Sequence, residues 1–217
     1  MRCAGVSLLA VAGAILGIRF VAPARAEEVP PLVAERTVVK DGAYHVDSMR
    51  TQVTFSVFCL GVSQYRGMFS GVSGALQLDS THPERSRVAL RLPVQSLITT
   101  SHSVMQTLWG EDWLDARKYP TAEFVSTSVI PEGLSQARVM GRLTLHGVTR
   151  PIVLQVHFVG AGESPLDHAY SVGFEAQGTI QRSAFGIRHF TTAVGDDVKL
   201  ALTGVFVEDT PEIAATP

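Results

Sequence analysis

The chain has 217 residues, of which 46% are hydrophobic and 18% are charged, and its formal net charge is −2. Only three of its basic residues are lysines (Lys40, Lys118 and Lys199), and they lie far apart in the sequence. Proteins that bind nucleic acid present a clustered basic face, so this composition argues against a nucleic-acid partner.

The N-terminus has the features of a secretory signal peptide. A basic start at Arg2 is followed by an apolar run over residues 4–18, and the stretch ends in the small-x-small sequence Ala24-Arg25-Ala26. The apolar run is shorter than the roughly 20 residues that a membrane-spanning helix requires. We therefore expect export and cleavage after Ala26, with an uncleaved anchor as the alternative.

Cleavage would remove Cys3 and leave Cys59 as the single cysteine. No intramolecular disulfide can then form, although exported proteins reach an oxidising compartment. We expect Cys59 to be buried as a small hydrophobic residue rather than exposed as a reactive thiol.

Residues 27–42 contain Pro30-Pro31 and no periodicity, which predicts a flexible lead-in, and residues 209–217 predict a flexible tail. Between them, over 43–208, apolar and polar residues alternate with the period of two that is typical of strands with one buried face. This alternation predicts about eight strands, over residues 53–59, 66–79, 87–95, 121–130, 136–146, 152–158, 170–177 and 198–206.

Two local features stand out from the alternation. His146-Gly147 predicts a tight hairpin turn between two of the strands. Over residues 100–116 the apolar positions instead have helical spacing, which predicts a short helix, a turn at Gly110, and a second helical turn that ends before Pro120. About eight antiparallel strands can close into a barrel or stack as a sandwich, and periodicity does not decide between the two.

A family resemblance bears on that choice. The chain resembles the YceI-like family of bacterial periplasmic polyisoprenoid-binding proteins over about residues 44–207. The resemblance is carried by Tyr44-x-x-Asp47, Phe55-x-Val57, Gly61-x-Ser63, Arg66-Gly67-x-Phe69, Ser96-Leu97-x-Thr99, Lys118-Tyr119-Pro120-x-x-x-Phe124, Ser126-Thr127, Gly141-x-Leu143-Thr144-Leu145-His146-Gly147-Val148-Thr149-x-Pro151, Arg182-Ser183-x-Phe185-Gly186 and Val194-Gly195-Asp196-Asp197-Val198.

The resemblance implies an all-β fold, an extended eight-stranded antiparallel lipocalin-like β-barrel with the short helical excursion at about 100–116. It also implies a periplasmic location and no cofactor or metal. The implied ligand is a long-chain amphiphile such as a polyisoprenoid, a quinone-like lipid or an acyl chain. A homodimer and a functional link to a membrane b-type cytochrome are further implications.

In such a barrel, the residues of inward parity would line the lumen and bind the ligand's tail. Burial of an apolar tail is favourable by roughly 25 cal/mol per Å², so no catalytic machinery is required. The candidate lining residues from the strands are Phe55, Val57, Cys59, Leu90, Leu92, Phe124, Leu154, Val156, Phe174, Ala176 and Leu202, to which we add Met105, Leu108, Trp109 and Phe185. The alternative is that many of them form a solid core.

The chain departs from the family's pattern at three places. Arg50 and Cys59 stand where the family usually has histidines, and Val104–Leu108 replaces an Arg-Asp-x-His-Leu segment. Either the lost polar groups mark a changed head-group site, or they were a structural network that has been repacked. Candidates for a head-group end are Arg50, His146 and Arg182. For His146 the alternative is a solvated turn residue, and for Arg182 an ion pair with Asp196 or Asp197.

Motifs of other functions are absent from the sequence. The seven histidines form neither His-x-His nor His-x-x-x-His, and there is no Gly-x-Ser-x-Gly elbow or phosphate-binding loop. Lipid binding without catalysis is therefore the expected function. Two alternatives remain: a stress-response interaction module, which predicts a filled core, and an enzyme acting on a lipid-like substrate, which predicts a polar pair with perturbed pKa values inside the lumen.

Overall fold

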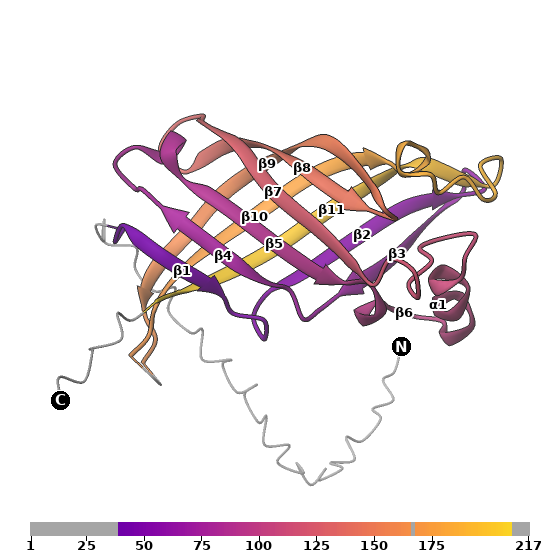
Figure 1. Ribbon diagram of the computed structural model, residues 1–217, viewed down its shortest axis with the longest axis horizontal. Helices are drawn as coiled ribbons and strands as arrows, with labels where there is room; N and C mark the ends of the chain where they lie inside the picture. The colour runs from indigo at the N-terminus through magenta and orange to yellow at the C-terminus, as the bar shows by residue number, and fades with distance from the viewer. Residues whose placement is uncertain (1–38, 166–167, 210–217) are drawn as a thin grey trace, which may run out of the picture. The chain divides into compact units, whose positions relative to one another are not determined.

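The computed structural model describes residues 39–165 and 168–209 (Figure 1). The expected signal peptide, most of the lead-in and most of the tail lie outside these residues. Within the lead-in, the described residues 39–41 contact the domain, since the Ser80 hydroxyl donates to the carbonyl of Val39 at 2.9 Å. No helix in the described ranges is both long enough and apolar enough to cross a membrane.

The described residues contain one antiparallel sheet and one short α-helix, α1 (His102–Trp109). Short 3-10 turns form at η1 (Pro83–Arg85), η2 (Val94–Ser96) and η3 (Arg182–Phe185). The strands are β1 (Gly42–Val46), β2 (Gln52–Cys59), β3 (Ser63–Phe69), β4 (Ser73–Leu78), β5 (Arg87–Pro93), β6 (Ile98–Thr99), β7 (Thr121–Pro131), β8 (Gln136–Leu145), β9 (Val148–Glu163), β10 (Tyr170–Gln181) and β11 (Val194–Glu208).

The sheet closes into a barrel through β1, a strand of five residues. β1 pairs with β4 on one side and with β11 on the other, where Tyr44 lies opposite Glu208. The closed ring therefore runs β1-β4-β5-β7-β8-β9-β10-β11, which gives eight strands, and β2 and β3 extend the wall beyond β1 and β4. Closure confirms the expected barrel and excludes the sandwich, because a sandwich keeps free sheet edges.

All eight expected strands form, with two differences in detail. The segment expected over 66–79 divides into β3 and β4 at Gly71, whose φ is +66°. β1 and the two-residue β6 were not predicted, because neither is long enough to show an alternating pattern.

The predicted turn at His146-Gly147 is confirmed. Both residues have positive φ (53° and 73°), and Leu145 faces Val148 across the hairpin. Two consecutive residues with positive φ make a type I′ turn, whose twist suits a two-residue hairpin. Gly147 fits for a second reason, since a Cβ on it would lie 2.4 Å from the ring of Tyr119.

The helical excursion is confirmed in its first half only. α1 begins at the N-cap Ser101, whose side chain accepts a hydrogen bond from the amide of Val104. The second expected helical turn is a series of hydrogen-bonded turns, in which Tyr119 N donates to Asp115 O at 2.8 Å. Asp115 has a φ of +43°, which no right-handed helix accommodates. The segment is held on the barrel by the buried residues Val94, Ala116 and Ala122.

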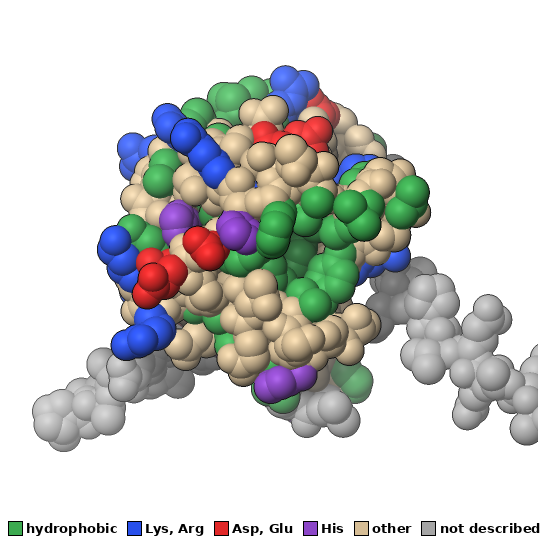
Figure 2. Space-filling view, turned by 90° about the vertical axis from the view of Figure 1, so that its right-hand side faces the viewer, with side chains coloured by type: hydrophobic (Ala, Val, Ile, Leu, Met, Phe, Trp, Pro, Cys, Tyr) green, Lys and Arg blue, Asp and Glu red, His purple; other side chains and the backbone are tan. Residues whose placement is uncertain are grey.

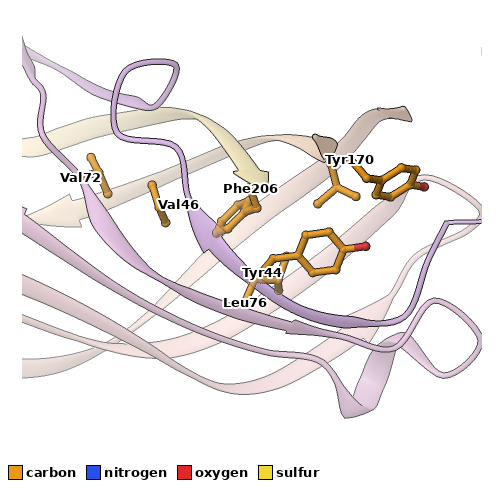
Figure 3. Close-up of a cluster of buried hydrophobic side chains, with 7 residues drawn as sticks. Tyr44, Val46, Val72, Leu76, Tyr170 and Phe206 are labelled. Atoms are coloured by element: carbon orange, nitrogen blue, oxygen red, sulfur yellow. The ribbon is translucent and has the colours of Figure 1, made fainter. Parts of the chain in front are cut away.

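One end of the barrel interior is filled by a core of large side chains, shown in Figure 3. Its buried members are Tyr44, Val46, Val72, Leu76, Tyr170, Val172 and Phe206, and Phe158 and Phe174 pack against them. The Tyr44 hydroxyl donates to the carbonyl of Lys40 at 2.6 Å, which satisfies the one polar group that this side chain brings inside. We call this region the filled end.

Candidate functional site

The other end of the barrel is hollow. A cavity of about 190 Å³ lies between the filled end and the end that carries α1 and η3. Viewed onto that end, Figure 2 shows a depression with hydrophobic side chains gathered around and inside it. The cavity is lined by Val53, Phe55, Val57, Phe69, Val72, Leu90, Leu92, Val94, Leu108, Trp113, Leu114, Ala122, Glu123, Phe124, Leu143, Leu145, Ile152, Leu154, Ala176, Ile180, Arg182, Ile187, Val194, Val198, Leu200 and Leu202.

The lining is almost wholly apolar. Only Glu123 and Arg182 carry charge, and the Glu123 carboxylate is engaged by Arg91 at 3.1 Å, with both side chains well exposed. Val72, Leu90 and Leu92 belong both to the lining and to the filled end, so the cavity tapers into the core. The result is a blind tube with an apolar floor.

Nine of the expected lining residues border this cavity. They are Phe55, Val57, Leu90, Leu92, Leu108, Phe124, Leu154, Ala176 and Leu202. Each of the eight strand residues stands at the inward parity of its strand, and Leu108 lies on α1, in the last turn of the helix. Parity also marks several lining residues outside the expected set, including Ile152, Val198 and Leu200. Trp113 and Ile187 lie in loops, where no periodic signal exists.

The other six expected residues lie elsewhere. Phe174 stacks against Phe158 and Phe206, with ring centroids 5.5 and 6.0 Å apart, so it belongs to the filled end. Val156, two residues before Phe158, does not border the cavity either. Trp109, the last residue of α1, packs against Val94, Ala116 and Ala122. Phe185, the last residue of η3, is 1% exposed. Met105 on α1 and the half-buried Cys59 are also outside the lining.

Two glycines shape the wall by making room for aromatic rings. A Cβ on Gly67 would lie 2.4 Å from the ring of Phe55, its cross-strand partner, and a Cβ on Gly141 would lie 2.3 Å from the ring of Phe124. Each ring therefore lies over a glycine, against the wall. The lumen stays open because these two phenylalanines occupy the space of missing side chains.

Arg182 is the one cationic side chain in the lining, and it is 4% exposed. The expected ion pair with Asp196 or Asp197 does not form. Instead the guanidinium donates to four backbone carbonyls, those of Gly195, Ile187, His189 and Val194, at 2.7–3.1 Å.

The acidic neighbour of Arg182 has a different partner. Asp196 accepts hydrogen bonds from the Ser183 amide and hydroxyl at 2.8 and 2.7 Å, and these bonds hold the pKa of Asp196 below its ordinary value. Burial lowers the pKa of Arg182, and the negative charge of Asp196 opposes that shift. Arginine stays charged in proteins, so the cavity end carries a fixed positive charge with no bound carboxylate.

The aromatic neighbour of Arg182 is Trp113. Trp113 lines the cavity, and the Arg182 guanidinium carbon lies 5.3 Å from its ring centroid. The Trp113 Nε1 is buried and has no hydrogen-bond partner among the described residues. Trp109 Nε1 and the Tyr65 hydroxyl share that condition, but neither residue borders the cavity.

The two remaining head-group candidates lie outside the lining. Arg50 is exposed and pairs with Asp47, with Nε 2.6 Å from Oδ2. His146 is half-buried, in contact with the Tyr119 ring at 4.8 Å between centroids. Its Nδ1 lies 3.1 Å from the Phe185 carbonyl and must donate, since a carbonyl only accepts. His146 thus ties the hairpin to η3, so it is not simply a solvated turn residue.

Comparison with known proteins now identifies the family. The family model described as a YceI-like domain matches residues 44–206. The chain belongs to the YceI-like family. This confirms the resemblance in the motifs, and the matched range runs from within β1 to within β11.

Curated YceI-like relatives match most of the chain. It is 36% identical over 157 residues to a UPF0312 protein of Pseudomonas savastanoi pv. phaseolicola, a match that covers 72% of this chain and 81% of the relative. A UPF0312 protein of Vibrio cholerae is 34% identical over 153 residues, which covers 70% and 80% of the two chains.

Solved structures share the YceI-like fold. BcnA of Burkholderia cenocepacia superposes with a TM-score of 0.67 at 24% identity, covering 74% of this chain and 98% of BcnA. A polyisoprenoid binding domain from Saccharophagus degradans gives a TM-score of 0.58 at 13% identity, covering 78% and 100%. At these identities the similarity establishes the fold alone.

Proposed function

We propose that this protein binds a long-chain amphiphile, with the apolar tail inside the hollow end of the barrel, and that it acts as a carrier or sequestering protein rather than an enzyme. The observation that carries the proposal is the blind cavity with its apolar lining. Membership of the YceI-like family supports it, as does the structural neighbour described as a polyisoprenoid binding domain.

The physical case rests on burial of the tail. Each buried methylene contributes about 0.8 kcal/mol, which is roughly a fourfold gain in affinity per carbon. That gain should continue until the tail meets the filled end and then stop. We therefore expect the dissociation constants of a homologous series of chains to fall steadily and then reach a plateau.

The alternative of a filled-core interaction module is less consistent with an open lumen. The enzyme alternative requires a polar pair inside the lumen. The two charged residues of the lining are Glu123 and Arg182. The Glu123 carboxylate pairs with Arg91, and the Arg182 guanidinium donates to backbone carbonyls. Neither forms a pair suited to proton transfer.

The first test is native mass spectrometry of the protein purified from its own cells, followed by solvent extraction of any bound lipid. The second is uptake of polyprenyl, quinone and acyl probes. Retention of a long-chain amphiphile in either experiment supports the proposal. A protein that is empty on purification and takes up none of these probes contradicts it.

A cavity-filling variant gives the sharper test. Ala176 borders the cavity and is 6% exposed, so Ala176→Phe should occupy the lumen and block uptake. The matched control is Ala201→Phe, on the outer face of the neighbouring strand β11. Both variants should give the circular dichroism spectrum of the parent. Equal uptake by both variants would place the ligand outside this cavity.

The proposal extends to compartment and assembly. We propose a periplasmic location on the strength of the N-terminal sequence, to be tested by cell fractionation and N-terminal sequencing of the mature chain. We also propose a homodimer through the outer face of β8 and β9, where Met140 and Val153 are opposite each other and 36% and 46% exposed. Light scattering of the parent and of a Val153→Glu variant tests it.

A further inference from the structure

Four large hydrophobic side chains are exposed beside the hollow end of the barrel. Phe58, Leu60 and Val62 belong to the hairpin that joins β2 to β3, and Phe190 belongs to the loop between η3 and β11. Their exposed fractions are 49%, 85%, 73% and 60% for Phe58, Val62, Leu60 and Phe190. The two segments lie side by side, since Leu60 N donates to the Ala193 carbonyl at 2.6 Å. We call these four side chains the apolar rim.

The apolar rim is continuous with the lining of the cavity. Val57 borders the cavity and directly precedes Phe58, while Ile187 and Val194 border it on either side of Phe190 in the chain. Figure 2 shows hydrophobic side chains extending from the depression onto the surface beside it. An amphiphile that enters or leaves the lumen at this end therefore meets apolar surface outside the cavity as well as inside it.

Two of the rim side chains occupy backbone positions that favour other residues. Leu60 has a φ of +53° and precedes Gly61 at +69°, in a two-residue hairpin turn where Asn, Asp and Gly are preferred. Phe190 has a φ of +49°, which is uncommon for a bulky residue. Such positions are concentrated at functional sites. Folding alone gives no reason for an exposed leucine or phenylalanine there, whereas a partner that covers both side chains does.

The loop that carries Phe190 is held in a fixed shape. The guanidinium of Arg182 donates to four backbone carbonyls between Ile187 and Gly195, at 2.7–3.1 Å. The amide of Val194 also donates to the Phe190 carbonyl at 2.8 Å. Phe190 is therefore exposed on a loop that a buried arginine supports.

The charge of the two segments indicates the chemistry of the partner. Residues 58–66 and 186–195 contain Arg66 and Arg188, both exposed, and no aspartate or glutamate. The acidic residues nearest to this end in the sequence lie in the helical excursion and at the start of β11. Exposed apolar side chains flanked by cations suit a bilayer surface with anionic lipids, because the apolar groups enter the interface and the cations attract the head groups.

We infer that the apolar rim docks this protein on a lipid bilayer that contains anionic lipid, so that the ligand passes between membrane and cavity without crossing water. The inference rests on the proposed function and adds the partner of the hollow end. Transfer of an apolar tail through water is costly, so a carrier gains by loading at a membrane. A second copy of the chain is a poorer partner, because an isologous contact would place the same cations on both sides and cover the cavity.

The first experiment is flotation of the purified protein with vesicles of phosphatidylcholine, alone or mixed with phosphatidylglycerol. We expect about tenfold tighter binding to the mixed vesicles, as two arginines near an anionic surface provide. Added salt should reduce this preference by screening. A parent protein that binds neither type of vesicle would overturn the inference.

Two variants test the rim itself. Leu60→Asn and Phe190→Asn remove the apolar side chains and suit the backbone, since asparagine tolerates a positive φ. Each should weaken vesicle binding about tenfold, through the loss of one large apolar side chain from the interface. The matched control is Leu134→Asn, in the loop between β7 and β8, where Leu134 is fully exposed. An equal loss in the control would contradict docking through the rim.

The cations are tested separately. A double variant that combines Arg66→Gln with Arg188→Gln should lose the preference for phosphatidylglycerol and its salt dependence, while its affinity for phosphatidylcholine vesicles stays that of the parent. The same preference in parent and double variant would contradict the anionic specificity.

Lipid transfer connects docking to the cavity. A pyrene-labelled fatty acid in the mixed vesicles should move to the parent about tenfold faster than to Leu60→Asn, in proportion to the fraction of protein on the vesicles. Dodecanoate added in solution should bind the parent and Leu60→Asn with equal affinity, because Leu60 does not border the cavity. Equal rates of transfer from vesicles would contradict a role of docking in loading.

These outcomes separate the two proposals. If the parent binds dodecanoate from solution but no vesicles, lipid binding stands and the docking inference fails. If it takes up neither dodecanoate nor the pyrene-labelled lipid, the proposed function fails. If light scattering shows self-association that Leu60→Asn abolishes, without vesicle binding, the rim is a contact between copies and the inference is overturned.

Discussion

The two ends of this barrel have the same sequence periodicity but opposite interiors. On β11, Phe206 is 4% exposed in the filled end, whereas Leu200 and Leu202, on the same face, are only half-buried because they border the cavity. The filled end brings together two tyrosines and three phenylalanines. In the hollow end, Phe55 and Phe124 lie against the wall over Gly67 and Gly141. Whether one end of a barrel is open or filled therefore depends on the side chains that face each aromatic ring.

The largest expected effect is on stability. Phe206→Ala should lower the free energy of unfolding by about 3–5 kcal/mol, the usual cost of removing a packed phenylalanine. Phe55→Ala, which widens a cavity that already exists, should cost less than half as much. Urea denaturation of both variants measures the difference. Equal losses would mean that the hollow end is as tightly packed as the filled one.

Ligand binding should change hydrogen exchange more in the hollow end of the barrel than in the filled end. A bound chain at a hundred times its dissociation constant stabilises the fold by about 2.7 kcal/mol. We expect the added protection from hydrogen exchange to concentrate in β2, β3 and the helical excursion, with little change in β1 and β4. Hydrogen–deuterium exchange with and without dodecanoate tests this, and uniform protection would argue against a ligand confined to one end.

Alkaline pH should weaken the filled end through Tyr44. Burial, with the nearby negative charge of Glu208, raises the pKa of Tyr44 from 10.0 to about 12. Between these values the unfolded chain has lost this proton and the folded chain has not, so the contribution of Tyr44 to stability falls as pH rises. The parent should lose stability from pH 10 toward pH 12 more steeply than Tyr44→Phe. Parallel slopes would contradict the raised pKa.

The smallest effect is expected at Gly67. A methyl group there meets the end of the Phe55 ring at 2.4 Å and the Ile98 carbonyl at 3.2 Å, so Gly67→Ala should push the ring into the lumen. We expect about a threefold to tenfold weaker affinity for long chains, equivalent to one or two lost methylenes, with a minor change in stability. Gly61→Ala, where a Cβ meets nothing within 4 Å, is a control for the loss of glycine, although its positive φ adds local strain. Unchanged affinity in Gly67→Ala would contradict the role of the glycine.

The strands and the hairpin could be predicted because their signals are local. Alternation over residues 198–206 reports burial of one face, and His146-Gly147 reports a turn that requires two positive φ values. For the site, the alternation of each strand predicted which side chains point inward, but not which of them border the cavity. Leu154 and Leu202 were found this way, whereas Phe174 has the same parity and lies in the filled end. Periodicity indicates which face of a strand points into the barrel, but not which side chains from other strands lie across the interior from it.

Local patterns in the sequence were enough to give the all-β class, the strand positions and the turn chemistry, and its motifs were enough to give the family. The remaining features depend on contacts between distant parts of the chain. Closure depends on Tyr44 meeting Glu208 from the other end of the domain, a contact that no local pattern encodes. The hollow depends on glycines facing phenylalanines across strands, and the contact of Arg182 with Trp113 depends on the loops that bring them together. Each joins residues far apart in the sequence, because a barrel interior is formed by all its strands together.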